Sequence, residues 1–187
     1  TKTSMSFIQS FMLSIMAGAF IAMGAMFFLL VSGDPDLPFA VQRVLGGALF
    51  SLGLLLIVVC GAELFTGNTM IVMSAASKKI SWGAVLKNWV VVFVGNFVGA
   101  LIIVGLVYLS GMHTMNGGIV GSTMVSVASS KMTPDWVTLF AKGIMCNFLV
   151  CLAVWIGYAG KTVADKMLGI LLPIAAFVAC GLSLIHI

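Results

Sequence analysis

The segment Cys60–Asn68 places polar side chains inside a long apolar stretch. Glu63 is the only charged residue among the thirty-three residues from Val44 to Ala76. A carboxylate at the centre of a bilayer costs about 2.5–3.5 kcal/mol on insertion scales, and such residues usually mark the paths of ions or protons. The position of Glu63 therefore indicates a functional site within a membrane.

The length of this stretch indicates how the backbone positions that site. A helix crosses the bilayer core with about 20 apolar residues. Residues 44–76 are too many for one straight span and too few for two. Irregular backbone is tolerated in a bilayer only where it is buried in protein or lines a wet cavity. We therefore expect a broken transmembrane helix whose break faces a transport pathway.

The composition supports a membrane protein. The chain is 61% hydrophobic and 7% charged, with a mean hydropathy of +1.23. A soluble domain of this size could not cover its surface with polar groups at that composition. The basic residues behind the net charge of +4 are scattered at segment ends, so we expect the lipid bilayer as a partner and no nucleic acid.

Five hydrophobic segments follow one another. They are Phe7–Val31, the broken Val44–Ala76, Val85–Leu109, Val137–Ala159 and a last segment that begins at Met167. Proline, glycine or charged residues separate them. The longest connection, Ser110–Pro134, contains four glycines and is predicted to be a loop.

The basic residues predict the orientation, because cytoplasmic loops are enriched in lysine and arginine. An N-terminus in the cytoplasm puts six lysines inside, namely Lys2, Lys78, Lys79, Lys87, Lys161 and Lys166. Only Arg43 and Lys131 would then lie outside, together with acidic residues that include Asp34 and Asp36.

A short sequence motif that occurs twice in the chain indicates an inverted repeat. Val58-Val59-Cys60-Gly61 ends the first arm of the second segment, and Val178-Ala179-Cys180-Gly181 occurs at the same depth in the fifth. The two segments run in opposite directions. Paired interrupted helices of this kind meet at the midplane in many transporters.

Three longer motifs carry a resemblance to a known family. They are Gly61-Ala-Glu-Leu-Phe-Thr-Gly67, Gly95-Asn-Phe-Val-Gly-Ala100 and the run from Lys142 to Trp155. The chain resembles the formate/nitrite transporter family from about Phe7 to Gly181. The resemblance implies an all-α, aquaporin-like bundle with an inverted repeat and broken second and fifth transmembrane helices. It also implies six helices per protomer, of which five are present here, in a homopentamer with one pore per protomer.

The resemblance also implies roles for particular residues. The apolar constrictions would be formed by Phe50, Leu54, Leu64, Phe65 and Phe177, with Leu54 at the inner one. Polar groups facing the substrate would be Thr66, the vestibule lysine Lys131 and the pore-side Asn147. Glu63, Gly67 and Asn68 would support the broken loop.

Each of these roles has a plainer alternative. Lys131 could be a solvated loop lysine, and Asn147 could form an interhelical hydrogen bond. Phe50 and Phe177 could be ordinary packing residues. Glu63 is better suited to accepting backbone N–H bonds in the break than to contacting substrate, because an anion path should not expose a carboxylate.

The last residues depart from the family pattern. After Gly181 the family continues with a pore histidine and a sixth helix, whereas this chain reads Leu182-Ser-Leu-Ile-His-Ile187. His186 lacks the surrounding motif. We therefore expect residues 1–181 to form a single, incomplete channel domain and 182–187 to be a non-native tail. The chain ending in this way should not transport.

Three functions follow from these patterns. The first is a channel or proton-coupled transporter for small monovalent anions of weak acids, with formate favoured over nitrite and hydrosulfide, in a bacterial inner membrane. The second is an aquaporin-like channel for neutral solutes, although Asn-Pro-Ala boxes are missing. The third is a membrane enzyme, which no catalytic motif supports. Neither a cofactor nor a metal is expected.

Overall fold

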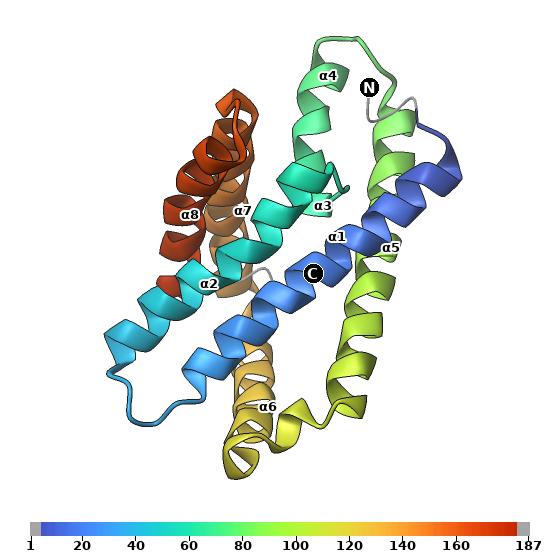
Figure 1. Ribbon diagram of the computed structural model, residues 1–187. Coiled ribbons are helices and arrows are strands. Elements are labelled where there is room, and N and C mark those ends of the chain that lie inside the picture. Colours follow the sequence, from blue (N-terminus) through green and yellow to red (C-terminus); the bar gives the residue numbers. More distant parts are fainter. Residues whose placement is uncertain (1–4, 183–187) are drawn as a thin grey trace.

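The computed structural model describes residues 5–182, and this part of the chain is helical throughout with no strand. The α-helices are α1 (Phe7–Ser32), α2 (Phe39–Cys60), α3 (Phe65–Asn68), α4 (Val72–Ala76), α5 (Trp82–Leu109), α6 (Ile119–Met132), α7 (Trp136–Ala159) and α8 (Val163–Ala179). Short 3-10 turns join α3 to α4 and α5 to α6. In Figure 1, α1 and α2 cross the molecule diagonally, with α5 on one side and the pair α7 and α8 on the other.

Polar side chains cap the N-termini of α1, α5, α7 and α8, whereas α2 begins after Pro38 without a side-chain cap. Ser6 accepts a hydrogen bond from the first turn of α1, and Ser81 does the same for α5. Asp135 caps α7, and Thr162 forms a reciprocal capping box with Asp165 at α8. These caps satisfy backbone N–H groups that have no partner inside the helix. Helices α1 and α7 begin at or next to the predicted starts, Phe7 and Val137, whereas α2 and α8 begin several residues before Val44 and Met167.

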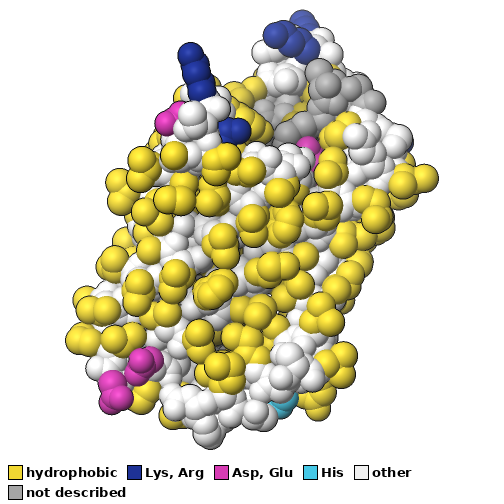
Figure 2. Space-filling view, viewed as in Figure 1, with side chains coloured by type: hydrophobic (Ala, Val, Ile, Leu, Met, Phe, Trp, Pro, Cys, Tyr) yellow, Lys and Arg dark blue, Asp and Glu magenta, His cyan; other side chains and the backbone are white. Residues whose placement is uncertain are grey.

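The long helices fit a bilayer, as predicted. Within the described residues, α1, α2, α5 and α7 are each long and apolar enough to cross a membrane. Helix α8 has 17 residues and packs along α2 and α7. Figure 2 shows a broad hydrophobic band between the two ends of the molecule, with basic side chains at the upper end. The chain is a multi-pass membrane protein.

The connection after α5 differs from the prediction of a loop. Residues Ile119–Met132 form helix α6, which ends one residue after Lys131. Glycines at 111, 117 and 118 adopt positive φ angles and turn the chain before the helix begins. The hydroxyls of Ser122, Thr123 and Ser130 donate to carbonyls of the same helix, as Thr123 does at 2.9 Å. Lys131 therefore projects from the last turn of a helix and not from a loop.

The two arms of the predicted inverted repeat end in the same way. Gly61 after α2 and Gly181 after α8 both adopt left-handed conformations, with φ angles of 70° and 66°. The N–H of Ala62 donates to the Ile57 carbonyl at 3.0 Å, and the N–H of Leu182 donates to the Phe177 carbonyl at 2.9 Å. This six-to-one bond is the signature of a Schellman motif. Residues 183–187, which make up most of the predicted tail, lie outside the described residues.

Helices α1 and α5 approach so closely that their backbones touch. A methyl group added at Gly99 would overlap the Ile15 carbonyl, and one added at Gly18 would overlap the Asn96 carbonyl. Small residues allow this approach in lipid, where close packing replaces the hydrophobic effect as the force between helices. The Gly95-x-x-x-Gly99 pattern in α5 therefore serves packing, as the sequence indicated.

This crossing gives a stability prediction. Gly99→Ala should destabilise the protein by about 1–3 kcal/mol, because the backbone of α1 cannot move aside as a flexible side chain would. Gly105→Ala is the matched control, since nothing lies within 4 Å of its added methyl group on the same helix. Thermal unfolding in detergent should show a lower midpoint for Gly99→Ala alone. Equal midpoints would contradict the described crossing of α1 and α5.

Candidate functional site

The break after α2 exposes backbone groups that a membrane cannot satisfy. Helix α2 ends at Cys60, the chain turns at Gly61, and α3 begins at Phe65. Leu64 is extended at this point, with φ −99° and ψ 133°. Glu63, Leu64 and Thr66 are only 2–4% exposed. The backbone of the break must therefore bond to other parts of the protein.

The side chain of Asn96 on α5 provides these bonds. Its Nδ2 donates to the Glu63 carbonyl at 2.9 Å and to the Ser14 carbonyl of α1 at 2.8 Å. Its Oδ1 accepts from the N–H of Phe65 at 2.9 Å, which is the first N–H of α3. The N–H of Glu63 itself donates to the Leu13 carbonyl at 3.2 Å. One amide thus joins α1, α5 and the break.

Glu63 has a structural partner in the side chain of Asn68. The Asn68 Nδ2 donates to a carboxylate oxygen of Glu63 and, at 3.0 Å, to Oδ1 of Asn88. The indole N–H of Trp89 donates to the Asn68 carbonyl at 3.1 Å. We expected backbone N–H groups as the partners of Glu63, and the structure adds the side-chain amide of Asn68 as a partner. The support role predicted for Glu63 and Asn68 rests on this buried cluster.

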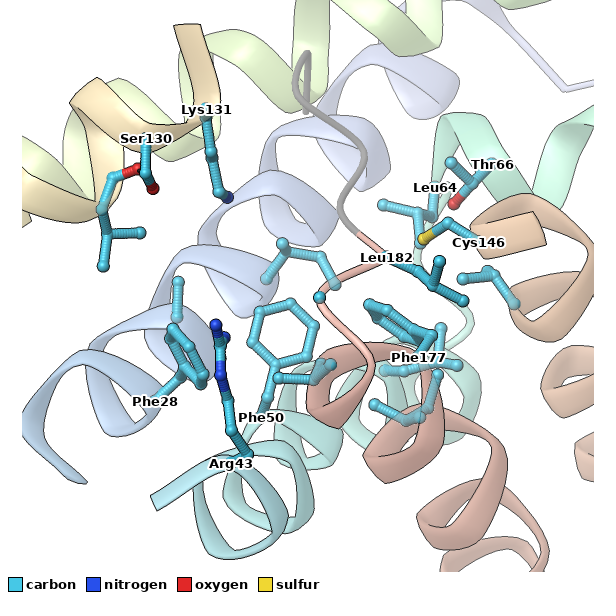
Figure 3. A pocket seen from close by; sticks show the side chains of 18 residues that line it. Phe28, Arg43, Phe50, Leu64, Thr66, Ser130, Lys131, Cys146, Phe177 and Leu182 are labelled. Atoms are coloured by element: carbon cyan, nitrogen blue, oxygen red, sulfur yellow. The ribbon is translucent and has the colours of Figure 1, made fainter. Parts of the chain in front are cut away.

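A cavity of about 230 Å3 lies on the α6 side of the break. We call it the basic cavity because Lys131 and Arg43 both line it. Figure 3 shows the two cations projecting into it from opposite walls, Lys131 from α6 and Arg43 from α2. Its other labelled lining residues are Phe28, Phe50, Leu64, Thr66, Ser130, Cys146, Phe177 and Leu182.

A second cavity of about 230 Å3 lies on the other side of the break and is bordered by Gly61, Ala62 and Glu63. We call it the break cavity. Leu54 and Leu64 line both cavities and are 1% and 4% exposed. A larger hollow shares Gly67 with the break cavity and reaches Lys79. Leu54 and Leu64 therefore form an apolar barrier between two hollows that lie toward opposite ends of the bundle.

Two aromatic rings narrow the basic cavity beside this barrier. Phe50 and Phe177 meet edge to face, with ring centroids 5.9 Å apart. Thr66 points its hydroxyl into the same region, and Oγ1 is buried without a hydrogen-bond partner. A buried hydroxyl without a partner costs about 1–3 kcal/mol.

Two predicted site residues lie elsewhere. Phe65 does not line the basic cavity; its ring packs edge to face on Phe93 and Trp89 of α5, at centroid distances of 5.6 and 6.1 Å. Leu64 and Phe65 are neighbours across the start of a helix, so their side chains point in different directions. Asn147 also lies off the cavity and donates to Oγ1 of Thr69 at 3.3 Å, while its own Oδ1 is buried without a partner.

Lys131 and Arg43, the two cations that line the basic cavity, have different surroundings. Burial lowers the pKa of the Lys131 ammonium below its ordinary value of 10.5, and the nearby Cys146 thiol acts in the opposite direction. Arg43 packs its guanidinium over the Phe39 ring, 5.3 Å from the centroid. Sequence reasoning placed Arg43 only on the outer side. A lining role could have been predicted from its position, because Arg43 lies seven residues before Phe50 and therefore on the same face of α2.

Comparisons with known proteins give a consistent result. A family model described as formate/nitrite transporter matches residues 1–185. The chain is 42% identical over 175 residues to a protein named formate channel FocA from Escherichia coli strain K12. That alignment covers 93% of this chain and 61% of the relative, so the chain spans about three fifths of the relative's length.

Two solved structures share the fold. One, titled pentameric formate channel with formate bound, has a TM-score of 0.90 at 38% identity and covers 95% of this chain and 70% of that one. The other, titled FNT family ion channel, has a TM-score of 0.83 at 31% identity and covers 93% of this chain and 68% of that one. Both structural alignments cover nearly all of this chain.

The hydrogen bonds of Asn96 give a second stability prediction. Asn96→Ala should lower the free energy of unfolding by more than about 2 kcal/mol, because it leaves buried backbone groups of α1 and the break without partners. Asn147→Ala is the matched control, with only one hydrogen bond of its own, at 3.3 Å. Thermal unfolding in detergent would measure both. A smaller loss for Asn96→Ala than for Asn147→Ala would show that other groups hold the break.

Proposed function

The chain belongs to the formate/nitrite transporter family, and we propose that it forms a channel or transporter for small monovalent anions of weak acids. Formate is the favoured substrate, with nitrite and hydrosulfide as the other members of the class. The observation that carries this proposal is the basic cavity. It combines two cations with an apolar barrier at its inner end.

The chemistry of a weak acid fits this arrangement. Positive charge in a low-dielectric hollow raises the local concentration of anions and offsets part of their loss of water. An apolar barrier opposes any species that remains charged, since burial of an unpaired charge is costly, and it admits the protonated acid far more readily. Lys131 would attract the anion, and Leu54 and Leu64 would reject ions that cannot be neutralised.

The remaining residues of the cavity have supporting roles in this proposal. Thr66 would offer its unpaired hydroxyl to the permeant species next to the barrier. Phe50 and Phe177 would narrow the approach with their edge-to-face pair. Asn147 is not among the residues that line the basic cavity, so its support would come through Thr69.

The assembly and orientation are part of the same proposal. A homopentamer is supported by the fold shared with the pentameric formate channel. The cytoplasmic side would be the end that carries the α4–α5 and α7–α8 turns, with Lys78, Lys79 and Lys161. That end lies opposite the α1–α2 loop in Figure 1, and lysine-rich loops favour the cytoplasm. The membrane would be the bacterial inner membrane.

Labelled solutes in proteoliposomes would separate this function from an aquaporin-like one. The full-length gene product should take up labelled formate faster than protein-free liposomes and leave glycerol at the protein-free rate. Glycerol uptake without formate uptake would contradict the proposal and favour the neutral-solute channel.

The lowered pKa of Lys131 gives a pH prediction. A lysine is charged below its pKa, so Lys131 loses its charge at a lower pH than an exposed lysine as the pH rises. With equal pH on both sides, formate uptake should fall more steeply in the wild type than in Lys131→Arg as the pH rises toward the ordinary lysine pKa of 10.5. Lys131→Ala should be slow at each pH.

The control for this series is Lys161→Arg, which makes the same replacement in the exposed α7–α8 turn and should keep the wild-type pH profile. If Lys131→Ala took up formate at the wild-type rate over a range of concentrations, Lys131 would have no part in the mechanism.

The barrier gives a selectivity prediction. Leu54→Ala should raise the chloride leak on the order of tenfold, the change that about 1.4 kcal/mol of barrier produces. Leu49→Ala, on the same helix but 37% exposed, is the matched control. Chloride efflux from loaded proteoliposomes measures both. A background leak in correctly assembled Leu54→Ala protein would show that the barrier lies elsewhere.

A further inference from the structure

We propose that Arg43 is a second anion-attracting residue of the basic cavity, acting from the wall opposite Lys131. The inference rests on the proposed function for its substrate class, small monovalent anions. The effect of Arg43 on the electrostatic potential inside the cavity does not depend on the substrate, because it follows from the position of the guanidinium.

The position of Arg43 is fixed by its helix and by an aromatic ring. It lies in the second turn of α2, and its guanidinium rests over Phe39 at 5.3 Å from the ring centroid. Figure 3 shows the guanidinium directed toward the interior of the cavity, between Phe28 and Phe50. Contact with an aromatic face holds a guanidinium in place and leaves its in-plane N–H groups free to donate.

The carboxylates at this end of the molecule do not line the cavity. None of the described lining residues is acidic. Asp34 accepts a hydrogen bond from the N–H of Asp36 at 3.0 Å, and Asp135 accepts one from the N–H of Thr138 at 3.4 Å. These carboxylates serve the backbone of loops and a helix start. The described lining of the cavity therefore carries two positive charges and no carboxylate.

Permanent charge distinguishes Arg43 from its partner across the cavity. A guanidinium stays protonated under all conditions in which proteins work, whereas a buried ammonium can lose its proton. Low-dielectric walls concentrate the field of a lining charge in the hollow between them. Arg43 therefore provides a permanent positive charge on the wall opposite Lys131.

The potential can be measured without any transport. Ser130 lines the same cavity and is exposed, so Ser130→Cys introduces a thiol that water-soluble reagents can reach. The rates of modification by an anionic and by a cationic methanethiosulfonate give a ratio that reports the local potential. Mass spectrometry of the peptide that contains residue 130 separates this thiol from the four native cysteines.

Adding Arg43→Gln should lower this anionic-to-cationic ratio by about fivefold or more, since one unit of lining charge acts on the two reagents in opposite directions. Arg43→Lys keeps the charge and should keep most of the ratio. Lys161→Gln removes the same charge at the opposite end of the bundle and should leave the ratio unchanged. An unchanged ratio in Arg43→Gln, with Arg43→Lys also unchanged, would overturn the inference.

Formate uptake separates this inference from the proposed function. Arg43→Gln should raise the half-saturating formate concentration by about three- to tenfold at low salt, and by less at high salt where the field is screened. An unchanged half-saturating concentration would overturn the role of Arg43 in attracting substrate. If the wild type moved no formate while the reagent ratio still depended on Arg43, the positive potential would stand and the proposed substrate would fall.

Discussion

The amide of Asn96 is the interaction on which the rest of the structure depends. A membrane helix can stop midway only if other groups of the protein satisfy its free backbone donors and acceptors. Asn96 satisfies the Glu63 carbonyl and the Phe65 N–H on the two sides of the break, and it also bonds the Ser14 carbonyl of α1. The close glycine-mediated crossing of α1 and α5 brings this side chain within reach. Packing of small residues is thus a condition for the break.

The break in turn creates the barrier and its two cavities. Because the chain is extended at Leu64, this side chain meets Leu54 of α2 at the level where the helix is interrupted. A continuous helix would fill this space with its own next turn. The Asn96 and Asn68 side chains bond polar groups of the break. Arg43 of α2 and Lys131 of α6 are the charged residues among the described lining of the basic cavity, whereas Glu63 borders the break cavity.

Much of this arrangement could be predicted from the sequence. The broken second helix followed from the position of Glu63 in an apolar run that was too long for one span. The inverted repeat followed from the Cys-Gly pair that ends α2 and α8. Lys131, Leu54, Leu64 and Thr66 came from the family resemblance, and the structure brings all four to one cavity.

The errors have physical reasons. Helix α6 was missed because its serines and threonine and the nearby glycines resemble a loop in composition, although Ser122 and Thr123 bond within the helix. Phe65 was placed beside Leu64, and sequence adjacency does not show that the helix start turns its ring toward Trp89 and Phe93. Arg43 was treated only as a topology signal, because a lining role depends on how α2 rotates against α8.

The central claim is that a small anion occupies the basic cavity above the Leu54 and Leu64 barrier. Anomalous diffraction from crystals of the full-length gene product in bromide would test it most directly. A bromide peak is expected inside the basic cavity, within reach of Lys131 and the Thr66 hydroxyl. Bromide bound at exposed lysines such as Lys161, with none in that cavity, would contradict it.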